Sequence, residues 1–176
     1  MQMKRAYRSL FVIACIGCSV ASAADRPNII FIFADDWGWG DLSCHGHPYL
    51  KTPNLDRLAS EGTEFYQFTV ASGVCSPSRA AVMTGHFPAR HSIHGHFATV
   101  ASHVKRGMPD WLDPQAVLLP RLLQDAGYAT AHYGKWHPTN IMCKEGAVPI
   151  KYGYDDYCSF NSAGTHMPDH DRANVV

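Results

Sequence analysis

Residues 28–34 form the clearest apolar run, with the letters Asn-Ile-Ile-Phe-Ile-Phe-Ala, and polar, glycine-rich sequence follows at once. Isoleucine and phenylalanine favour strands, and here they occupy both alternating faces. A strand that is buried on both faces has this pattern. We therefore predict a central strand over residues 28–34 and a loop over residues 35–49.

A helical pattern follows this loop. Thr52 and Pro53 suit the N-cap and the first position of a helix, and Gly62 suits its end. The apolar residues between them recur on one face, as in an amphipathic helix. Residues 63–70 have the composition of a second strand.

The pattern then predicts another helix and a long loop. The helix should occupy residues 76–84 and end at Gly85. Ser76 would be its N-cap and Pro77 its first residue. Residues 86–114 are rich in His, Gly and Pro and show no clear period, which indicates a long functional loop.

A further helix and strand complete the alternation. Residues 118–126 predict an amphipathic helix that Gly127 ends, and residues 128–133 predict a strand. Strands that alternate with helices indicate an α/β fold with a mostly parallel sheet flanked by helices.

Residues 1–23 differ from the rest. Three basic residues precede a short apolar run, residues 10–20, which ends in Ala-Ser-Ala. This is the pattern of a signal peptide cut before Ala24, and the run is shorter than the roughly 20 residues that span a bilayer. We therefore expect a secreted or periplasmic protein with no membrane span after leader cleavage. An uncleaved anchor, or lipid attachment at Cys15 or Cys18, is the alternative.

Charge and cysteine content narrow the class of protein. The whole chain has 15 basic and 15 acidic residues, and cleavage of the leader removes three basic and no acidic ones, so the net charge becomes about −3. This balance argues against a nucleic-acid binder. Four cysteines remain after cleavage, and their spacing matches no disulfide framework or paired zinc knuckle. They are Cys44, Cys75, Cys143 and Cys158.

Asp35 and Asp36 directly follow the first predicted strand. The carboxyl ends of strands in open α/β sheets are where such sheets bind ligands, and paired carboxylates suit a hard cation such as Ca²⁺ or Mg²⁺. Two neighbouring side chains can share one ion only where the chain leaves the strand and turns. Solvated turn residues are the alternative interpretation of this pair.

The run Cys75-Ser76-Pro77-Ser78-Arg79 is the sharpest chemical feature. A helix that starts here places Cys75 at its positive end, where backbone N–H groups favour an anion. Arg79 lies one turn further on and can direct its guanidinium at the same anion, which suits sulfate or phosphate. A small buried cysteine before an ordinary helix is the alternative.

Several histidines and a cysteine suggest a zinc site. They lie in the runs His94-Gly95-His96 and Cys44-His45-Gly46-His47. Neither run contains a Cys-x₂-Cys or a His-Glu-x₂-His frame, so we interpret the histidines of residues 86–103 as part of a substrate loop.

Four segments follow one another in a specific order. They are residues 35–38 (Asp-Asp-Trp-Gly), 52–59 (Thr-Pro-Asn-Leu-Asp-Arg-Leu-Ala), 73–85 (Gly-Val-Cys-Ser-Pro-Ser-Arg-Ala-Ala-Val-Met-Thr-Gly) and 127–137, where Gly-Tyr-Ala-Thr leads to Gly-Lys-Trp-His. In this combination the chain resembles the type I, formylglycine-dependent, arylsulfatase-like sulfatases. The resemblance covers residues 27–161.

The resemblance implies an alkaline-phosphatase-like fold and hydrolysis of a sulfate ester, either an aryl sulfate or a sulfated glycan. It also implies that a separate maturation enzyme oxidises Cys75 to formylglycine during export. The hydrate of this aldehyde would attack sulfur, as in other covalent catalysis. Asp35, Asp36 and the group formed from Cys75 would then bind a divalent cation, Ca²⁺ or in its place Mg²⁺.

The resemblance assigns further roles by position. Arg79 would hold the formylglycine hydrate, and Lys135 would offset charge on the sulfate or on the leaving oxygen. His137 would hydrogen-bond the hydrate. Without the resemblance, a solvated strand end would be the simpler interpretation of Lys135 and His137.

The chain also departs from the family pattern. Pro138 and Thr139 stand where Leu-Gly is usual, and His86 stands where arginine is common. Family members are longer, so we expect residues 24–176 to be the amino-terminal part of a truncated catalytic domain with little turnover by itself. A catalytically dead secreted remnant that binds sulfated ligands, and a phosphatase or phosphodiesterase of the same superfamily, are the alternatives.

Overall fold

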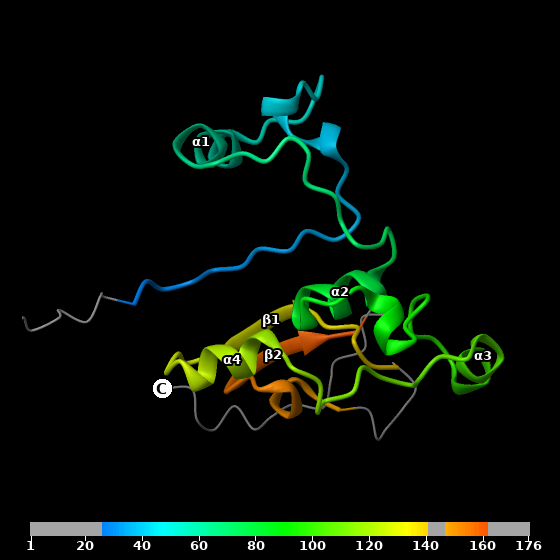
Figure 1. Cartoon of the computed structure of the whole chain (residues 1–176). Helices are drawn as coiled ribbons and strands as arrows, with labels where there is room; N and C mark the ends of the chain where they lie inside the picture. The colour runs from blue at the N-terminus through cyan, green and yellow to red at the C-terminus, as the bar shows by residue number, and fades with distance from the viewer. Residues whose placement is uncertain (1–25, 141–146, 162–176) are drawn as a thin grey trace, which may run out of the picture. The chain divides into compact units, whose positions relative to one another are not determined.

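The computed structural model describes residues 26–140 and 147–161 (Figure 1). Its contacts divide the chain after Phe33 into two units. The expected leader, residues 1–23, lies outside the described residues. Within the described part of the chain, no helix is long and apolar enough to cross a membrane.

Residues 28–34 do not form the predicted central strand. The described part of the chain has one sheet of two strands, and neither strand pairs with this run. An apolar run acquires strand geometry only when a neighbour accepts and donates its backbone hydrogen bonds. The prediction of a strand over residues 63–70 is wrong for the same reason.

The first helix of the described chain, α1 (Pro53–Glu61), lies where the sequence predicts it. Thr52 is its N-cap and Gly62 its C-cap. The Thr52 hydroxyl donates to the Asp56 carboxylate over 2.8 Å, and the Ser43 hydroxyl donates to the other oxygen of that carboxylate over 2.6 Å. This network holds the preceding loop against the first turn of α1.

Helix α2 (Cys75–Thr84) confirms the predicted end but not the predicted start. Gly85 has a φ of 65° and its N–H bonds to the Ala81 carbonyl, which is a left-handed C-cap that favours glycine. The N-cap is Val74 rather than Ser76. Ser76 lies inside the first turn, where its hydroxyl accepts a hydrogen bond from the Phe97 N–H over 3.0 Å.

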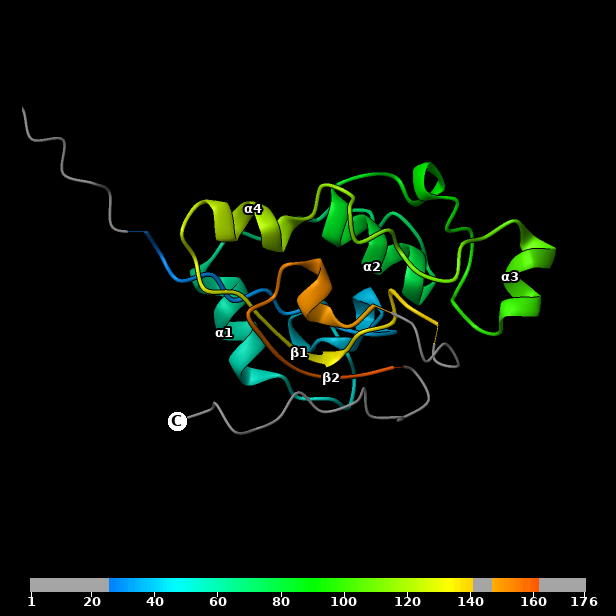
Figure 2. The same ribbon diagram turned by 90° about the horizontal axis from the view of Figure 1, so that it is seen from below.

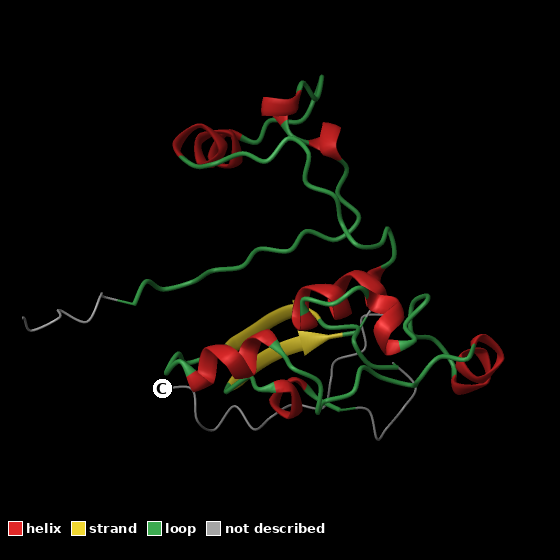
Figure 3. Ribbon diagram, in the orientation of Figure 1, coloured by secondary structure: helices red, strands yellow, loops and turns green. Residues whose placement is uncertain are grey.

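The segment predicted as a loop, residues 86–114, contains a 3-10 turn (Pro88–His91) and helix α3 (Val100–Arg106). Figure 3 shows α3 as a separate helix between stretches of loop. The Thr99 side chain caps α3 by accepting from the Ser102 N–H over 3.3 Å, and Gly107 ends it in the left-handed conformation. Seven residues are too few to give a clear helical period, so the sequence pattern does not reveal α3.

The sheet consists of β1 (Ala131–Lys135) and β2 (Asp156–Phe160), paired in parallel. Figures 1 and 2 both show the two strands side by side. The strand predicted at residues 128–133 therefore lies slightly later, and β2 is not predicted at all. Helix α4 (Leu119–Asp125) precedes β1 at the predicted place.

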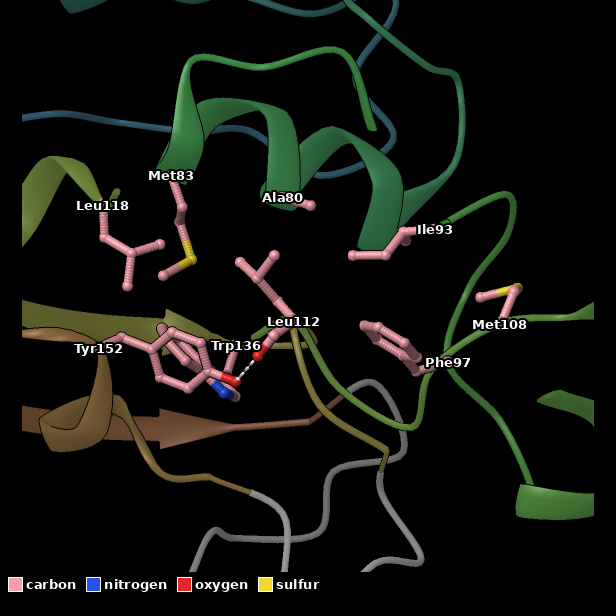
Figure 4. Packing of buried hydrophobic residues seen from close by; sticks show 9 residues of the cluster. All are labelled: Ala80, Met83, Ile93, Phe97, Met108, Leu112, Leu118, Trp136 and Tyr152. Carbon is pink, nitrogen blue, oxygen red and sulfur yellow. Dashed lines mark hydrogen bonds between the residues drawn. The ribbon is translucent and has the colours of Figure 1, made fainter. Parts of the chain in front are cut away.

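A hydrophobic cluster fills the space between α2 and the strands (Figure 4). Ala80 and Met83 reach it from α2, and Trp136 reaches it directly after β1. The Tyr152 hydroxyl donates to the Leu112 carbonyl over 2.6 Å, so the one polar atom of this ring is satisfied inside the cluster. Packing of this kind fixes the start of α2 relative to the end of β1.

Candidate functional site

Cys75 is the first residue of α2 and is half-buried. The Ser78 N–H bonds to the Val74 carbonyl over 3.0 Å, and the Ser78 hydroxyl donates to the Ser72 carbonyl. These bonds hold the turn before Cys75 in place. The prediction that Cys75 lies at the positive end of a helix is therefore confirmed, and such a position favours an anion.

Arg79 lies one turn further along α2 and is 8% exposed. Its Nη1 donates to the Lys135 carbonyl over 2.5 Å, and its Nη2 donates to Asp35 Oδ1 over 3.3 Å. The guanidinium therefore connects the start of α2, the end of β1 and the loop that holds Asp35. Burying this charge is tolerable because a carboxylate and a carbonyl accept from it.

Lys135 is the last residue of β1, and its Nζ donates to Asp35 Oδ2 over 2.6 Å. Burial lowers the pKa of Lys135, but the hydrogen bond that it donates to Asp35 and its interactions with Cys75 and Asp35 outweigh this effect and raise the pKa above its usual value. The ammonium group is thus stabilised beside both the carboxylate and the cysteine. Its side chain is 15% exposed, which leaves it accessible to a ligand.

The Asp35 carboxylate accepts hydrogen bonds from both Lys135 and Arg79. Burial raises the pKa of Asp35, but the hydrogen bonds from Lys135 and Arg79 and the charges of these two residues lower it by more, so the net pKa lies below its usual value. Asp36 is exposed and has a φ of 53°, and no hydrogen bond or ion pair joins it to another described residue. The structure therefore brings Asp35, Arg79 and Lys135 together but leaves Asp36 outside this cluster.

His137 is buried and has a φ of 59°. Its Nε2 donates to the Phe97 carbonyl over 2.9 Å, and its backbone N–H donates to the Asn161 side-chain oxygen over 3.0 Å. Burial lowers the pKa of His137, and the positive charges of Lys135 and Arg79 contribute to that lowering. A neutral ring that donates from Nε2 carries its acceptor on Nδ1.

The contacts of His137 with Phe97 and Asn161 were not predicted from the sequence. Phe97 contributes a backbone carbonyl, and because every residue has one, the amino-acid type at position 97 does not predict this contact. Asn161 follows directly after β2, a strand that the pattern did not reveal. A polar residue at the carboxyl end of a parallel strand is the signal that could have identified it.

The predicted cation does not fit the described residues by themselves. Ca²⁺ takes six to eight oxygen ligands. Both oxygens of Asp35 already accept from Lys135 and Arg79, and no group of three or more His, Cys, Asp or Glu residues within the described ranges could hold a metal ion. The cation site therefore stays a prediction.

The histidine runs lie in different surroundings. His45 Nε2 bonds to the Glu64 carboxylate over 2.5 Å, and its ring stacks on Trp39 with centroids 3.8 Å apart. His96 is exposed, and its ring centroid lies 6.5 Å from that of His137. His96 is thus near a predicted catalytic residue, whereas His45 stabilises the loop before α1.

Comparison with known proteins agrees with this geometry. Residues 27–175 match the sulfatase family. N-acetylgalactosamine-6-sulfatase of Canis lupus familiaris is 39% identical over 171 residues, which cover 94% of this chain and 31% of that relative. The chain therefore spans about a third of the length of this curated relative.

Two solved structures share the fold. The structure of Ps i-CgsB is 38% identical, with a TM-score of 0.62, and the match covers 77% of this chain and 28% of that one. A Bacteroides thetaiotaomicron protein, described with the metabolism of multiple glycosaminoglycans, is 35% identical, with a TM-score of 0.64 and the same coverage. These matches confirm the predicted α/β, alkaline-phosphatase-like fold. The sequence match over residues 27–175, together with the cluster around Cys75, shows that the chain belongs to the sulfatase family.

Proposed function

We propose that the protein that contains this chain hydrolyses sulfate esters at the cluster formed by Cys75, Arg79, Lys135 and Asp35. The observation that carries the proposal is the position of Lys135, whose ammonium group bonds to Asp35 over 2.6 Å, while Arg79 bonds to the other oxygen of the same carboxylate over 3.3 Å. Two cations face one carboxylate here, so the cluster has one positive charge in excess. A sulfate group carries the opposite charge and would be attracted to it.

The nucleophile is proposed to be formylglycine, made from Cys75 by a maturation enzyme during export. The aldehyde adds water to give a geminal diol. One hydroxyl attacks sulfur and displaces the alcohol, which leaves a sulfate ester on the former cysteine. The second hydroxyl then loses its proton, the carbon–oxygen bond to sulfate breaks, and sulfate leaves as the aldehyde forms again. A simple alcohol would remain sulfated, so the second hydroxyl is essential.

The described residues support this chemistry in distinct ways. Arg79 is fixed by its bonds to the Lys135 carbonyl and Asp35, so it can hold the hydrate without reorganising. Lys135 offsets negative charge on the sulfate or on the leaving oxygen. His137 is neutral around neutral pH, since its pKa is lowered by burial, and hydrogen-bonds the hydrate as a neutral ring.

We propose a sulfated glycan as the substrate class. The similarity to N-acetylgalactosamine-6-sulfatase supports a sulfated sugar, and so does the similarity to a protein described with glycosaminoglycan metabolism. An aryl sulfate serves as a general reporter substrate. Export to the periplasm or the medium follows from the expected leader and places the protein where extracellular glycans occur.

The test uses the complete protein that contains this chain, produced in a host with the maturation enzyme. Hydrolysis of an aryl sulfate is compared with hydrolysis of the matching aryl phosphate and of sulfated sugars. We expect a clear preference for sulfate, and a preference for phosphate would overturn the proposal. No hydrolysis of either, despite formylglycine at position 75, would indicate the ligand-binding remnant. Metal analysis of the same sample tests the predicted Ca²⁺ or Mg²⁺.

A further inference from the structure

His103 is a buried histidine outside the cluster around Cys75. It lies on α3 and is 1% exposed. Its Nδ1 is 2.5 Å from Asp110 Oδ1, and its Nε2 is 2.6 Å from the Ala98 backbone nitrogen. Both ring nitrogens are therefore engaged, one by a carboxylate and one by the main chain.

The partners of His103 fix its tautomer. A backbone N–H can only donate, so Nε2 of His103 must accept from Ala98. The proton of the neutral ring then lies on Nδ1 and points to Asp110. The carboxylate thus orients the ring, and the ring in turn holds the backbone at Ala98.

Residue 97, next to Ala98, makes two contacts with the candidate site. The Phe97 carbonyl accepts from His137 Nε2 over 2.9 Å, and the Phe97 N–H donates to the Ser76 hydroxyl over 3.0 Å. Ser76 directly follows Cys75 in α2. The Phe97 side chain is buried in the hydrophobic cluster, as Figure 4 shows, so the backbone of this residue has little freedom.

We propose that His103 and Asp110 are positioning residues that hold the Phe97 backbone in register with both His137 and the first turn of α2. The inference rests on the proposed sulfatase function, in which His137 and the group made from Cys75 act on the same sulfate. His103 touches neither group. It acts through one peptide segment that binds both.

Two substitutions separate this role from a general contribution to folding. A glutamine at position 103 places its amide near the former Nε2, so His103→Gln can still accept from Ala98. An asparagine places its amide near the former Nδ1, so His103→Asn keeps the contact with Asp110 and loses the contact with Ala98. Both variants remove the ring and introduce an amide, which makes them a matched pair.

The variants are made in the complete, matured protein, with Lys105→Gln on the exposed side of α3 as the control. We expect His103→Asn to lower kcat for an aryl sulfate at least about tenfold more than His103→Gln, with KM little changed. Thermal unfolding of both variants and the folded fraction by circular dichroism are measured in parallel. Equal losses of kcat in the two variants, or losses that match the folded fraction, would overturn the proposal.

A crystal structure of each variant gives a readout that does not depend on activity. In His103→Asn the distance from the Phe97 carbonyl to His137 Nε2 should increase from 2.9 Å, while His103→Gln should keep it. An unchanged distance in His103→Asn would contradict the positioning role. Absence of sulfatase activity in the unsubstituted protein would instead contradict the proposed function, and the two failures are thereby distinguished.

Discussion

Lys135 Nζ lies 2.6 Å from Asp35 Oδ2, although 100 positions separate the two residues in the sequence. Arg79 bonds to the other oxygen of the same carboxylate over 3.3 Å. The carboxylate therefore holds two cations that would otherwise repel each other near Cys75. This arrangement concentrates positive charge at the start of α2 and keeps it ordered before a ligand arrives.

Asp35→Asn should change the acid stability of the protein. The pKa of Asp35 is lowered in the folded state, so its charge stabilises the fold above its ordinary pKa of 3.8, and that stabilisation is lost as the pH falls through the folded pKa. Denaturant unfolding of the unsubstituted protein and of Asp35→Asn is measured from about pH 5 down to about pH 2. The free energy of unfolding should fall less steeply with falling pH in the variant. Parallel curves would show that Asp35 is not coupled to folding.

Cys75 should be modified in the exported protein. Conversion of cysteine to formylglycine lowers the mass of the peptide by about 18 Da, which peptide mass spectrometry detects. Cys75→Ala should abolish hydrolysis of an aryl sulfate in the complete protein while circular dichroism remains unchanged, because the residue is at a helix start and only half-buried. An unmodified thiol in an active preparation would contradict the mechanism.

Capping residues and glycines in the sequence correctly predicted where some helices begin or end. Thr52 and Gly62 delimit α1, and Gly85 ends α2, because caps and left-handed glycines are read from a few neighbouring residues. Strands were predicted less well. The run at residues 28–34 has the composition of a buried strand but no partner in the described sheet, and β2 has a partner but no distinctive pattern.

The candidate site was predictable in part. The order of the segments around Asp35, Cys75 and Lys135 identified the residues, but no local pattern shows that a carboxylate and an ammonium group 100 positions apart will form an ion pair. The contacts of Phe97 could not be predicted from the sequence, because this residue binds His137 and Ser76 through its backbone. Residue type shows side-chain chemistry, whereas positioning by the main chain depends on tertiary structure.

Arg79→Lys should impair catalysis although the charge is conserved. Arg79 donates to the Lys135 carbonyl and to Asp35 at once, and a lysine ammonium cannot reproduce this planar fork. We expect kcat/KM for an aryl sulfate to fall about 100-fold. Arg57→Lys is the matched control, because Arg57 is exposed and forms an ion pair with Glu61 along the surface of α1. A similar, small effect of both substitutions would contradict the assigned role of Arg79.

His132 should make the fold sensitive to mild acid. Its ring meets that of Trp136 edge to face, with centroids 5.0 Å apart, and its Nδ1 bonds to the Ser159 hydroxyl across the two strands over 2.6 Å. Burial, together with the charge of Arg79, lowers the pKa of His132 from 6.5 to about 4. The unfolded chain therefore binds a proton at a pH where the folded chain does not, and stability falls as the pH falls from 6.5 towards about 4.

The expected loss over that pH interval is about 3 kcal/mol. His132→Gln removes the titrating group but keeps a polar side chain beside Ser159, so its unfolding free energy should depend less on pH in this interval. Denaturant unfolding of the complete protein and of the variant, at matched pH values, measures the difference between the two slopes. Equal slopes would mean that His132 keeps an ordinary pKa in the folded protein and would contradict the prediction.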